Sequence, residues 1–461
     1  MVADGDSTPA DPRSAIRTRR YRVLLVLAAL VGLLVSAASW GFLELVHEMQ
    51  VGIYNDLPDD LGYAAAPWWW PFPWLALAGL LTAFAIQRLP GRGGHVPSAG
   101  LSTGGAPTEP IDLPGILLAA VATLGLGLVL GPEAPLIALG AGLGIFAIRR
   151  VRKDSPKQAQ ALMAAAGSFA AVSAIFGSPV IGAVIIIEAA GIGGAMLPLV
   201  LLPGLLSAGI GSLVFIGLGN WSGLSTTAWT LSPFPLPAFG GLGWGNFGWT
   251  IVLAVAVAVG IALVVEGARW TARIVHSRPF LLTIGAGLAV GGLALAFSQA
   301  TGEPTDAVLF SGQDELGSVF TSAATVSLST LALLLVFKGL AWSISLGNFR
   351  GGPTFPALLV GVVAGLLAGH LPGYSETPAV AALTGAACVS ILKLPLSSVL
   401  IATLLSHSAG FAVTPLIIVA VVVAYLTSQA LAARAEARLP AATTEHVEEP
   451  APASPAATVP T

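Results

Sequence analysis

Long apolar stretches broken by Gly and Pro run along the chain from about residue 23 to about residue 430. The stretches at 23–43, 74–86, 251–265 and 416–425 have the length of a membrane span or of a large part of one. Other stretches are shorter, and an apolar segment of roughly 10–14 residues favours a re-entrant or half-length helix over a spanning one. The hydropathy pattern therefore predicts an all-α polytopic membrane protein that contains broken helices.

One short pattern interrupts the apolar stretches twice, once in each half of the chain. It reads Gly-Pro-Glu-Ala-Pro at 131–135 and Gly-Pro-Thr-Phe-Pro at 352–356, and each copy leads into a stretch rich in small residues. A Gly-Pro interruption repeated in matching positions of two apolar halves is typical of the binding site of a membrane transporter. The first copy carries Glu133, and an ionisable residue in such surroundings is expected to have a function.

A second pair of matching segments supports an internal repeat. The segments 164–182 and 381–398 both run from small residues into a turn that contains a proline. Those prolines, Pro179 and Pro395, are 216 positions apart, and the final prolines of the Gly-Pro pattern are 221 positions apart. Two nearly equal offsets indicate a duplicated unit with a site between its copies. We expect the repeats at about 21–215 and 245–430.

Composition excludes several other classes of protein. The chain of 461 residues is 55% hydrophobic and only 9% charged, which fits a polytopic membrane protein and not a soluble domain. Its net charge of −3 offers no basic region for nucleic acid. The single cysteine, Cys388, excludes a disulfide framework, and the histidines show no metal-ligand spacing. We therefore expect neither a cofactor nor a metal.

Basic residues mark the expected topology. They precede the first apolar stretch and recur in later connections, which predicts that the N-terminus and these connections are cytoplasmic. They are Arg17, Arg19, Arg20 and Arg22, then Arg88 and Arg92, then Arg149, Arg150, Arg152, Lys153 and Lys157. The polar ends at 1–20 and 434–461 are predicted to be disordered tails of one membrane domain, 21–433, in the plasma membrane.

An ordered set of motifs resembles the CLC family of chloride channels and proton-coupled chloride antiporters. The run 131–135 is similar to the family's Gly-Arg-Glu-Gly-Pro signature, and 351–356 is similar to its Gly-Gly-Ile-Phe-Ala-Pro segment. The run 176–182, followed by Glu188, is similar to the family's Phe-Asn-Ala-Pro-Leu-Ala-Gly stretch and its glutamate. The likeness covers about residues 23–430, nearly the whole membrane domain.

The resemblance implies a CLC-like fold with broken, re-entrant helices in two inverted halves, assembled as a homodimer with one pore per subunit. It also implies transport of chloride or a related small anion, with Glu133 as gate and proton acceptor. Peptide N–H groups and a partial positive charge allow a helix N-terminus to bind an anion. The carboxylate of Glu133 can occupy such a site itself until it is protonated or displaced. The alternative is that Glu133 only caps its own helix.

The resemblance assigns anion-binding roles to residues at the expected helix starts. They are Gly104, Gly105, Pro107, Gly131, Ala134, Gly352, Thr354, Phe355 and Phe411. The run 103–107, Thr-Gly-Gly-Ala-Pro, has Gly104 where the family's Gly-Ser-Gly-Ile-Pro loop has its serine. The family's tyrosine is matched by the run 408–411, Ser-Ala-Gly-Phe, which contains no tyrosine. Both usual hydroxyl ligands are therefore absent from their expected positions, and Ser102 or Thr103 is the alternative source of the first hydroxyl.

Two further departures concern proline and acid positions. Pro132 and Pro353 have no N–H to donate, although proline favours a helix start. They either leave anion affinity unchanged or weaken it, and the Thr354 hydroxyl can return one donor. Glu188 is followed by Ala189 where family antiporters often carry a second acid. Glu188 is thus either a proton relay or a structural residue at a helix end.

Several functions stay open from the residues alone. Anion transport takes one of two forms, a proton-coupled antiporter or a passive channel. Broken helices also occur in sodium- or proton-coupled transporters of other substrates. An intramembrane serine protease needs a buried Ser–His pair, for which Ser102 and His407 are poor candidates, so we expect no enzyme. Lys338 and Lys393, at the edges of apolar segments, favour snorkelling or capping over anion steering.

Overall fold

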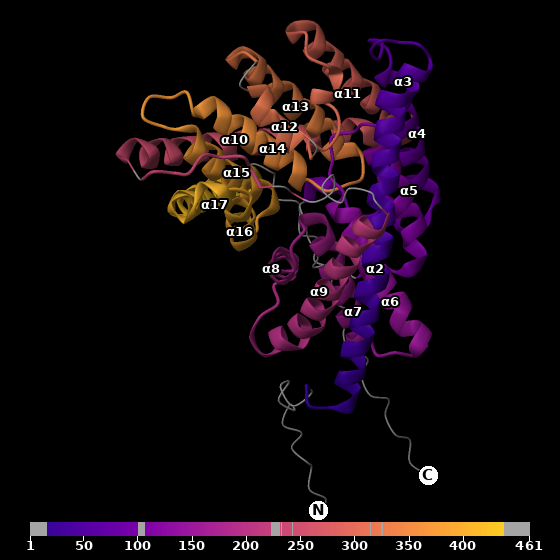
Figure 1. Cartoon of the computed structure of the whole chain (residues 1–461). Coiled ribbons are helices and arrows are strands. Elements are labelled where there is room, and N and C mark those ends of the chain that lie inside the picture. Colours follow the sequence, from indigo (N-terminus) through magenta and orange to yellow (C-terminus); the bar gives the residue numbers. More distant parts are fainter. Residues whose placement is uncertain are drawn as a thin grey trace, which may run out of the picture.

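Helices form most of the first half of the chain in the computed structural model (Figure 1). The structure describes residues 16–99, 107–222, 231, 233–241, 243–313, 315–323 and 326–437. The first half contains α2 (Arg19–Val51), a π-helical turn η1 (Gly52–Asp56), α3 (Leu57–Asp60), α4 (Pro71–Arg88), η2 (Pro90–Gly93), η3 (Pro97–Ala99), η4 (Pro110–Asp112), α5 (Leu113–Gly125), α6 (Glu133–Val151), α7 (Lys157–Phe176), α8 (Pro179–Ala189), η5 (Gly194–Met196) and α9 (Leu197–Ser222).

The second half repeats this helical character. It contains α10 (Trp244–His276), α11 (Pro279–Thr301), η7 (Thr305–Ala307), α12 (Glu315–Ala323), α13 (Leu328–Asn348), α14 (Thr354–Ala368), α15 (Glu376–Leu392), α16 (Pro395–Leu405), η8 (His407–Ala409), η9 (Phe411–Val413) and α17 (Thr414–Ala437). The helix α17 includes residues 434–437, which were predicted to begin a tail. The rest of that predicted tail and residues 1–15 lie outside the described residues.

The lengths of the helices agree with the prediction of spanning and broken segments. Within the described residues, eight helical segments are long and apolar enough to cross a membrane, including Arg19–Asp60, Trp244–His276 and Phe411–Ala435. Others are apolar but shorter, among them Pro179–Ala189, Thr354–Ala368 and Pro395–Leu405. The four long stretches predicted from hydropathy fall in α2, α4, α10 and α17.

Local signals explain where corresponding helices in the two halves begin and end. Both α8 and α16 begin with a proline, whose fixed φ suits the first helical turn and whose missing N–H is not needed there. The preceding helices, α7 and α15, both end at a left-handed residue, Gly177 with φ +62° and Lys393 with φ +60°. The two matched segments in the sequence are therefore also matched in backbone conformation.

Small residues let neighbouring helices approach closely. A Cβ added to Gly140 on α6 would collide with the carbonyl of Gly167 on α7. In the second half, a Cβ added to Gly361 on α14 would lie only 2.6 Å from the Cα of Thr384 on α15. These two contacts join corresponding helix pairs, so the small-residue pattern of each half serves the same packing.

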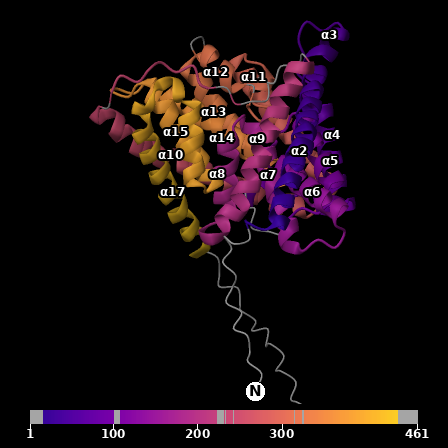
Figure 2. The ribbon, with the colours of Figure 1, turned by 60° about the horizontal axis from the view of Figure 1, so that its bottom comes forward.

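The two halves of the chain lie side by side. Figure 2 shows α10, α15 and α17 on one side and α2, α4, α5 and α6 on the other. The helices α7, α8 and α9 lie between these groups, and α8 packs against α16 of the second half. One buried apolar cluster extends through both halves. Both Gly-Pro motifs are buried in this arrangement, apart from the half-buried Ala134.

Candidate functional site

The two Gly-Pro motifs meet through an antiparallel backbone bridge between Gly131 and Gly352. The Gly131 N–H donates to the Gly352 carbonyl at 2.7 Å, and the Gly352 N–H donates to the Gly131 carbonyl at 2.5 Å. A Cβ at Gly351 would lie 2.7 Å from the Leu130 Cβ, and a Cβ at Gly352 would overlap the Glu133 carboxylate. The two loops approach so closely that positions 351 and 352 require glycine. The bridge between the loops joins the two halves at the site.

Both motifs start a helix in the same way. Pro132 is the N-cap of α6 with φ −82° and ψ −3°, and Pro353 is the N-cap of α14 with φ −92° and ψ −5°. Each proline therefore lies just before the first helical residue, where the missing N–H is tolerated. The N–H groups that follow, at Glu133 and Thr354, remain available. In this geometry the prolines do not remove the donors of the first helical turn.

The carboxylate of Glu133 reaches across to the N-terminus of α14. Glu133 is 0% exposed, and its Oε1 accepts a hydrogen bond of 3.0 Å from the Phe355 N–H. The peptide N–H groups of Glu133 and Thr354 and the hydroxyl of Thr354 also lie beside the carboxylate. A buried anion is thus held mainly by peptide dipoles at the N-termini of both helices. Glu133 therefore contacts the start of α14 as well as the start of its own helix.

Two polar atoms at this point have spare bonding capacity. Glu133 Oε2 and Thr354 Oγ1 are buried and have no hydrogen-bond partner among the described residues. A buried polar group without a full set of partners is costly in the ground state, so such groups often mark a functional site. The site can therefore accept a proton at the carboxylate, and the Thr354 hydroxyl can donate to an anion that replaces it.

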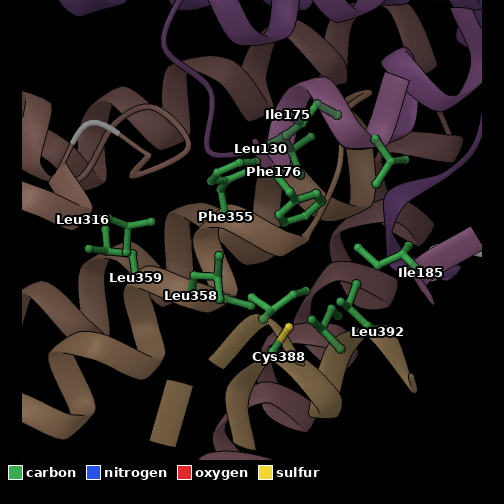
Figure 3. Packing of buried hydrophobic residues seen from close by; sticks show 14 of the residues in the cluster. Leu130, Ile175, Phe176, Ile185, Leu316, Phe355, Leu358, Leu359, Cys388 and Leu392 are labelled. Carbon is green, nitrogen blue, oxygen red and sulfur yellow. The ribbon is translucent and has the colours of Figure 1, made fainter. Parts of the chain in front are cut away.

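An aromatic pair closes one side of the site. Phe176, at the end of α7, stacks on Phe355 with ring centroids 6.0 Å apart and planes 10° apart (Figure 3). Phe176 and Phe355 are 4% and 0% exposed. The rings exclude water from the start of α14, which strengthens the electrostatic interactions of the peptide N–H groups. Phe176 was absent from the predicted site residues, although it begins the motif at 176–182.

A cavity of about 1070 Å³ approaches the site from one side. Ala134, next to Glu133, lines it together with Pro107, so the structure brings these two predicted residues to one space. Polar side chains along the cavity wall are Tyr21, His95, Thr108, Gln158 and Ser168. The predicted residues Gly104 and Gly105 lie outside the described residues.

Glu188 holds the N-terminus of a helix in the second half. Its Oε1 accepts from the Leu396 N–H at 2.8 Å, and its Oε2 accepts from the N–H and hydroxyl of Ser397 at 2.7 and 2.6 Å. These contacts satisfy donors in the first turn of α16. The relay alternative is not tested by them.

The remaining predicted anion-binding residues differ in where the structure places them. Gly131, Gly352, Thr354 and Phe355 gather around the Glu133 carboxylate. Phe411, in η9, has a side chain that is 89% exposed and is not brought into this buried group.

The family comparison agrees with the motifs. The sequence profile described as "Voltage gated chloride channel" matches residues 75–429. The "Putative ion-transport protein YfeO" of Escherichia coli O139:H28 (strain E24377A / ETEC) is 28% identical over 379 residues, which covers 81% of this chain and 84% of that protein. The same protein of Shigella boydii serotype 4 (strain Sb227) shows the same identity and coverage.

Solved structures share the fold. A slow cyanobacterial Cl⁻/H⁺ antiporter superimposes with a TM-score of 0.69 at 20% identity, covering 88% of this chain and 94% of the other. A CLC-type fluoride/proton antiporter superimposes with a TM-score of 0.68 at 18% identity, covering 89% and 96%. These likenesses confirm the predicted CLC-like fold. Since the family profile spans most of the membrane domain, the chain belongs to the voltage-gated chloride channel family.

Proposed function

We propose that this protein moves chloride or a related small inorganic anion across the membrane, with Glu133 as the gate. The observation that carries the proposal is the hydrogen bond from the Phe355 N–H to Glu133 Oε1 at 3.0 Å. A carboxylate there occupies a place that suits an inorganic anion, because both are held by peptide N–H groups at a helix N-terminus. An anion that displaces the side chain opens the path.

Proton coupling is the second part of the proposal. Glu133 binds a proton when it leaves the N–H groups and binds none when it returns, so anion and proton movements alternate at one site. The cavity that reaches Ala134 supports access of water to the neighbourhood of the carboxylate. Glu188 is bound to the start of α16, which favours a structural role, so we do not assign it as the relay. A passive channel is the alternative form.

We further propose a homodimer in the plasma membrane with a cytoplasmic N-terminus. Arginines at the start of α2 support this orientation through the positive-inside rule. Apolar side chains on α8, α9 and α16 support association with lipid and with a second copy. Among them, Val180, Leu213 and Leu396 are 58%, 73% and 62% exposed. Accessibility of an N-terminal tag in intact cells tests the orientation, and cross-linking in bilayers tests the dimer.

The deciding experiment measures anion efflux and proton movement together from proteoliposomes that contain the purified full chain. We expect the wild type to move anions and protons, and Glu133→Gln to lose proton movement while still passing anions. Glu266→Gln is the matched control, because Glu266 is exposed and pairs with Arg269 on the surface of α10. No anion movement by the wild type under any gradient or pH refutes the proposal.

Anion choice and the alternative substrates are tested in the same vesicles. Chloride, nitrate and fluoride are compared side by side, because the usual hydroxyl ligands are absent and Thr354 offers a different one. Movement of anions by the wild type without any proton flux indicates the passive channel. A flux that requires sodium indicates a transporter of the other class.

A further inference from the structure

Arg350 is a cationic residue next to the bridged loops with no role in the site described so far. It lies between the end of α13 and the start of α14, two residues before Gly352. Its Cα is therefore at most about 7 Å from that of Gly352, which borders the Glu133 carboxylate. Its backbone N–H donates to Thr123 Oγ1 on α5 at 3.4 Å. The backbone position of Arg350 is thus tied to both halves.

The side chain of Arg350 extends towards α5 and η2. A Cβ on Gly93, at the end of η2, would lie 3.2 Å from Arg350 Cγ and 3.3 Å from the Ala119 Cβ. The next two residues after η2, Gly94 and His95, line the large cavity. The stem of the Arg350 side chain therefore packs beside the segment that leads into the cavity wall.

The guanidinium has unused hydrogen-bond donors. One donor, Nη1–H, bonds to the Phe349 carbonyl at 3.0 Å. Arg350 Nε is buried and has no partner among the described residues, and Arg350 forms no ion pair within that part of the chain. A guanidinium has five N–H donors, and burying one without a partner is costly.

The other cations near the bundle interior are bound differently. Lys338, on α13, is 1% exposed, and its Nζ donates to the carbonyls of Ala307 and Leu309. Lys393 donates to the Ser390 carbonyl at 2.6 Å, at the end of its own helix. Lys338 thus binds carbonyls of another segment, and Lys393 binds a carbonyl at the end of its own helix. Arg350 is distinguished from them by its buried donor without a partner.

Two differences between this chain and the family motifs also point to Arg350. The family signature has an arginine where this chain has Pro132, so that charge is missing from the first motif. Arg350 supplies a charge of the same sign from the neighbouring loop, across the Gly131–Gly352 bridge. This chain also lacks the two hydroxyl ligands of the inner anion site. A guanidinium provides N–H donors together with a fixed positive charge, which suits an anion ligand.

We propose that the Arg350 guanidinium binds a small inorganic anion on the side of the bridge that faces η2. Its Nε–H and a free Nη–H donate to the anion, in place of the missing hydroxyl groups. This proposal rests on the proposed function, because the anion bound is the transported one. Gly352, two residues after Arg350, borders the Glu133 carboxylate, so the proposed site and the gate belong to one loop. The side chain is therefore a residue for anion affinity and entry rather than for gating.

Chloride binding to the purified full chain tests the proposal by titration calorimetry. Arg350→Gln is expected to raise the Kd for chloride by about ten- to a hundredfold, because a hydrogen bond to a charged group is lost. Arg350→Lys keeps the charge but loses the Nε–H donor, so at least a tenfold increase is expected. Arg273→Gln, which removes an exposed charge near the end of α10, is the control and should leave Kd unchanged.

The outcomes of the chloride-binding experiment can be distinguished from those of the transport assay. If Arg350→Gln does not fold, Arg350→Lys decides, and a Kd within twofold of the wild type overturns the proposal. Absence of chloride binding by the wild type overturns it as well. A wild type that binds chloride through Arg350 but moves no anion refutes the proposed function and leaves the site standing. Normal transport with unchanged chloride Kd in both variants refutes the Arg350 site alone.

Discussion

Replacing Glu188 with alanine removes the three hydrogen bonds that hold the start of α16. The acceptor distances are 2.8, 2.7 and 2.6 Å, and the donors are the N–H groups of Leu396 and Ser397 and the Ser397 hydroxyl. A hydrogen bond to a charged group contributes about 1.5–3 kcal/mol, but three bonds that share one half-buried carboxylate are not additive. We therefore expect Glu188→Ala to lower the free energy of unfolding by about 2–4 kcal/mol.

Denaturant unfolding in detergent measures this loss, and a double-mutant cycle locates it. Ser397→Ala removes only the hydroxyl contact and should cost about 1 kcal/mol. The two changes together should cost less than the sum of the single changes, since they disrupt the same interaction. Glu266→Ala is the control, because its exposed pair with Arg269 contributes at most about 1 kcal/mol.

The proton-to-anion ratio then separates a cap from a relay. If Glu188 only caps α16, its substitution lowers stability, while the proton-to-anion ratio of the folded Glu188→Gln protein in proteoliposomes stays at the wild-type value. Unchanged stability of Glu188→Ala, within about 0.5 kcal/mol, refutes the capping argument. Loss of proton movement in Glu188→Gln with intact anion movement identifies a relay instead.

Two further perturbations address the gate and the pH dependence of stability. Gly352→Ala places a Cβ where Glu133 Oε2 lies, so the carboxylate must leave the N-terminus of α14. We expect faster anion flux and a lower proton-to-anion ratio in proteoliposomes. A wild-type ratio contradicts this argument. Burial raises the pKa of Asp306, in η7, above its usual value, while the Thr305 hydroxyl and the Lys338 charge reduce that shift. Because the folded state binds this proton more tightly, protonated Asp306 contributes stability that is complete below the unfolded-state pKa of about 3.9 and is lost as pH rises through the higher folded-state pKa. Asp306→Asn should therefore flatten the pH dependence of the free energy of unfolding in that window. An unchanged pH profile contradicts this account.

The sequence predicted the fold well because the signals for it are local. Apolar length, prolines at helix starts and the repeated Gly-Pro pattern each act over a few residues, and they predicted helices such as α2 and α14. The bridge between Gly131 and Gly352 could not be derived in this way, because it joins residues far apart in the chain. Similarly, the contact of Glu188 with the start of α16 could not be derived, because Leu396 lies 208 positions further along the chain.

Buried charges were the least predictable feature. Lys338 was expected to snorkel or to act as a cap, since the sequence suggested that it lies at the edge of an apolar segment. It is instead buried and bound to the carbonyls of Ala307 and Leu309, so the expectation of snorkelling was wrong. Hydropathy describes the cost of burying an ammonium group, but the carbonyls that offset this cost come from another part of the chain. Phe176 was missed for a similar reason, because its partner Phe355 lies in the other half.

The contacts of Glu133 and Glu188 mean that the two halves have become chemically unequal. In both cases a carboxylate from the first half meets peptide N–H groups at the start of a helix in the second half, α14 or α16. At the motif offset of 221, Glu133 corresponds to Thr354, and at the offset of 216, Glu188 corresponds to Leu404. The second half thus has no acid at either position to return the contact. A chain assembled from two copies of the first half would bring carboxylates together, and one assembled from two copies of the second half would leave both helix starts without an anion. The duplicated architecture therefore joins a half that supplies carboxylates to a half that supplies peptide N–H donors, and neither can substitute for the other.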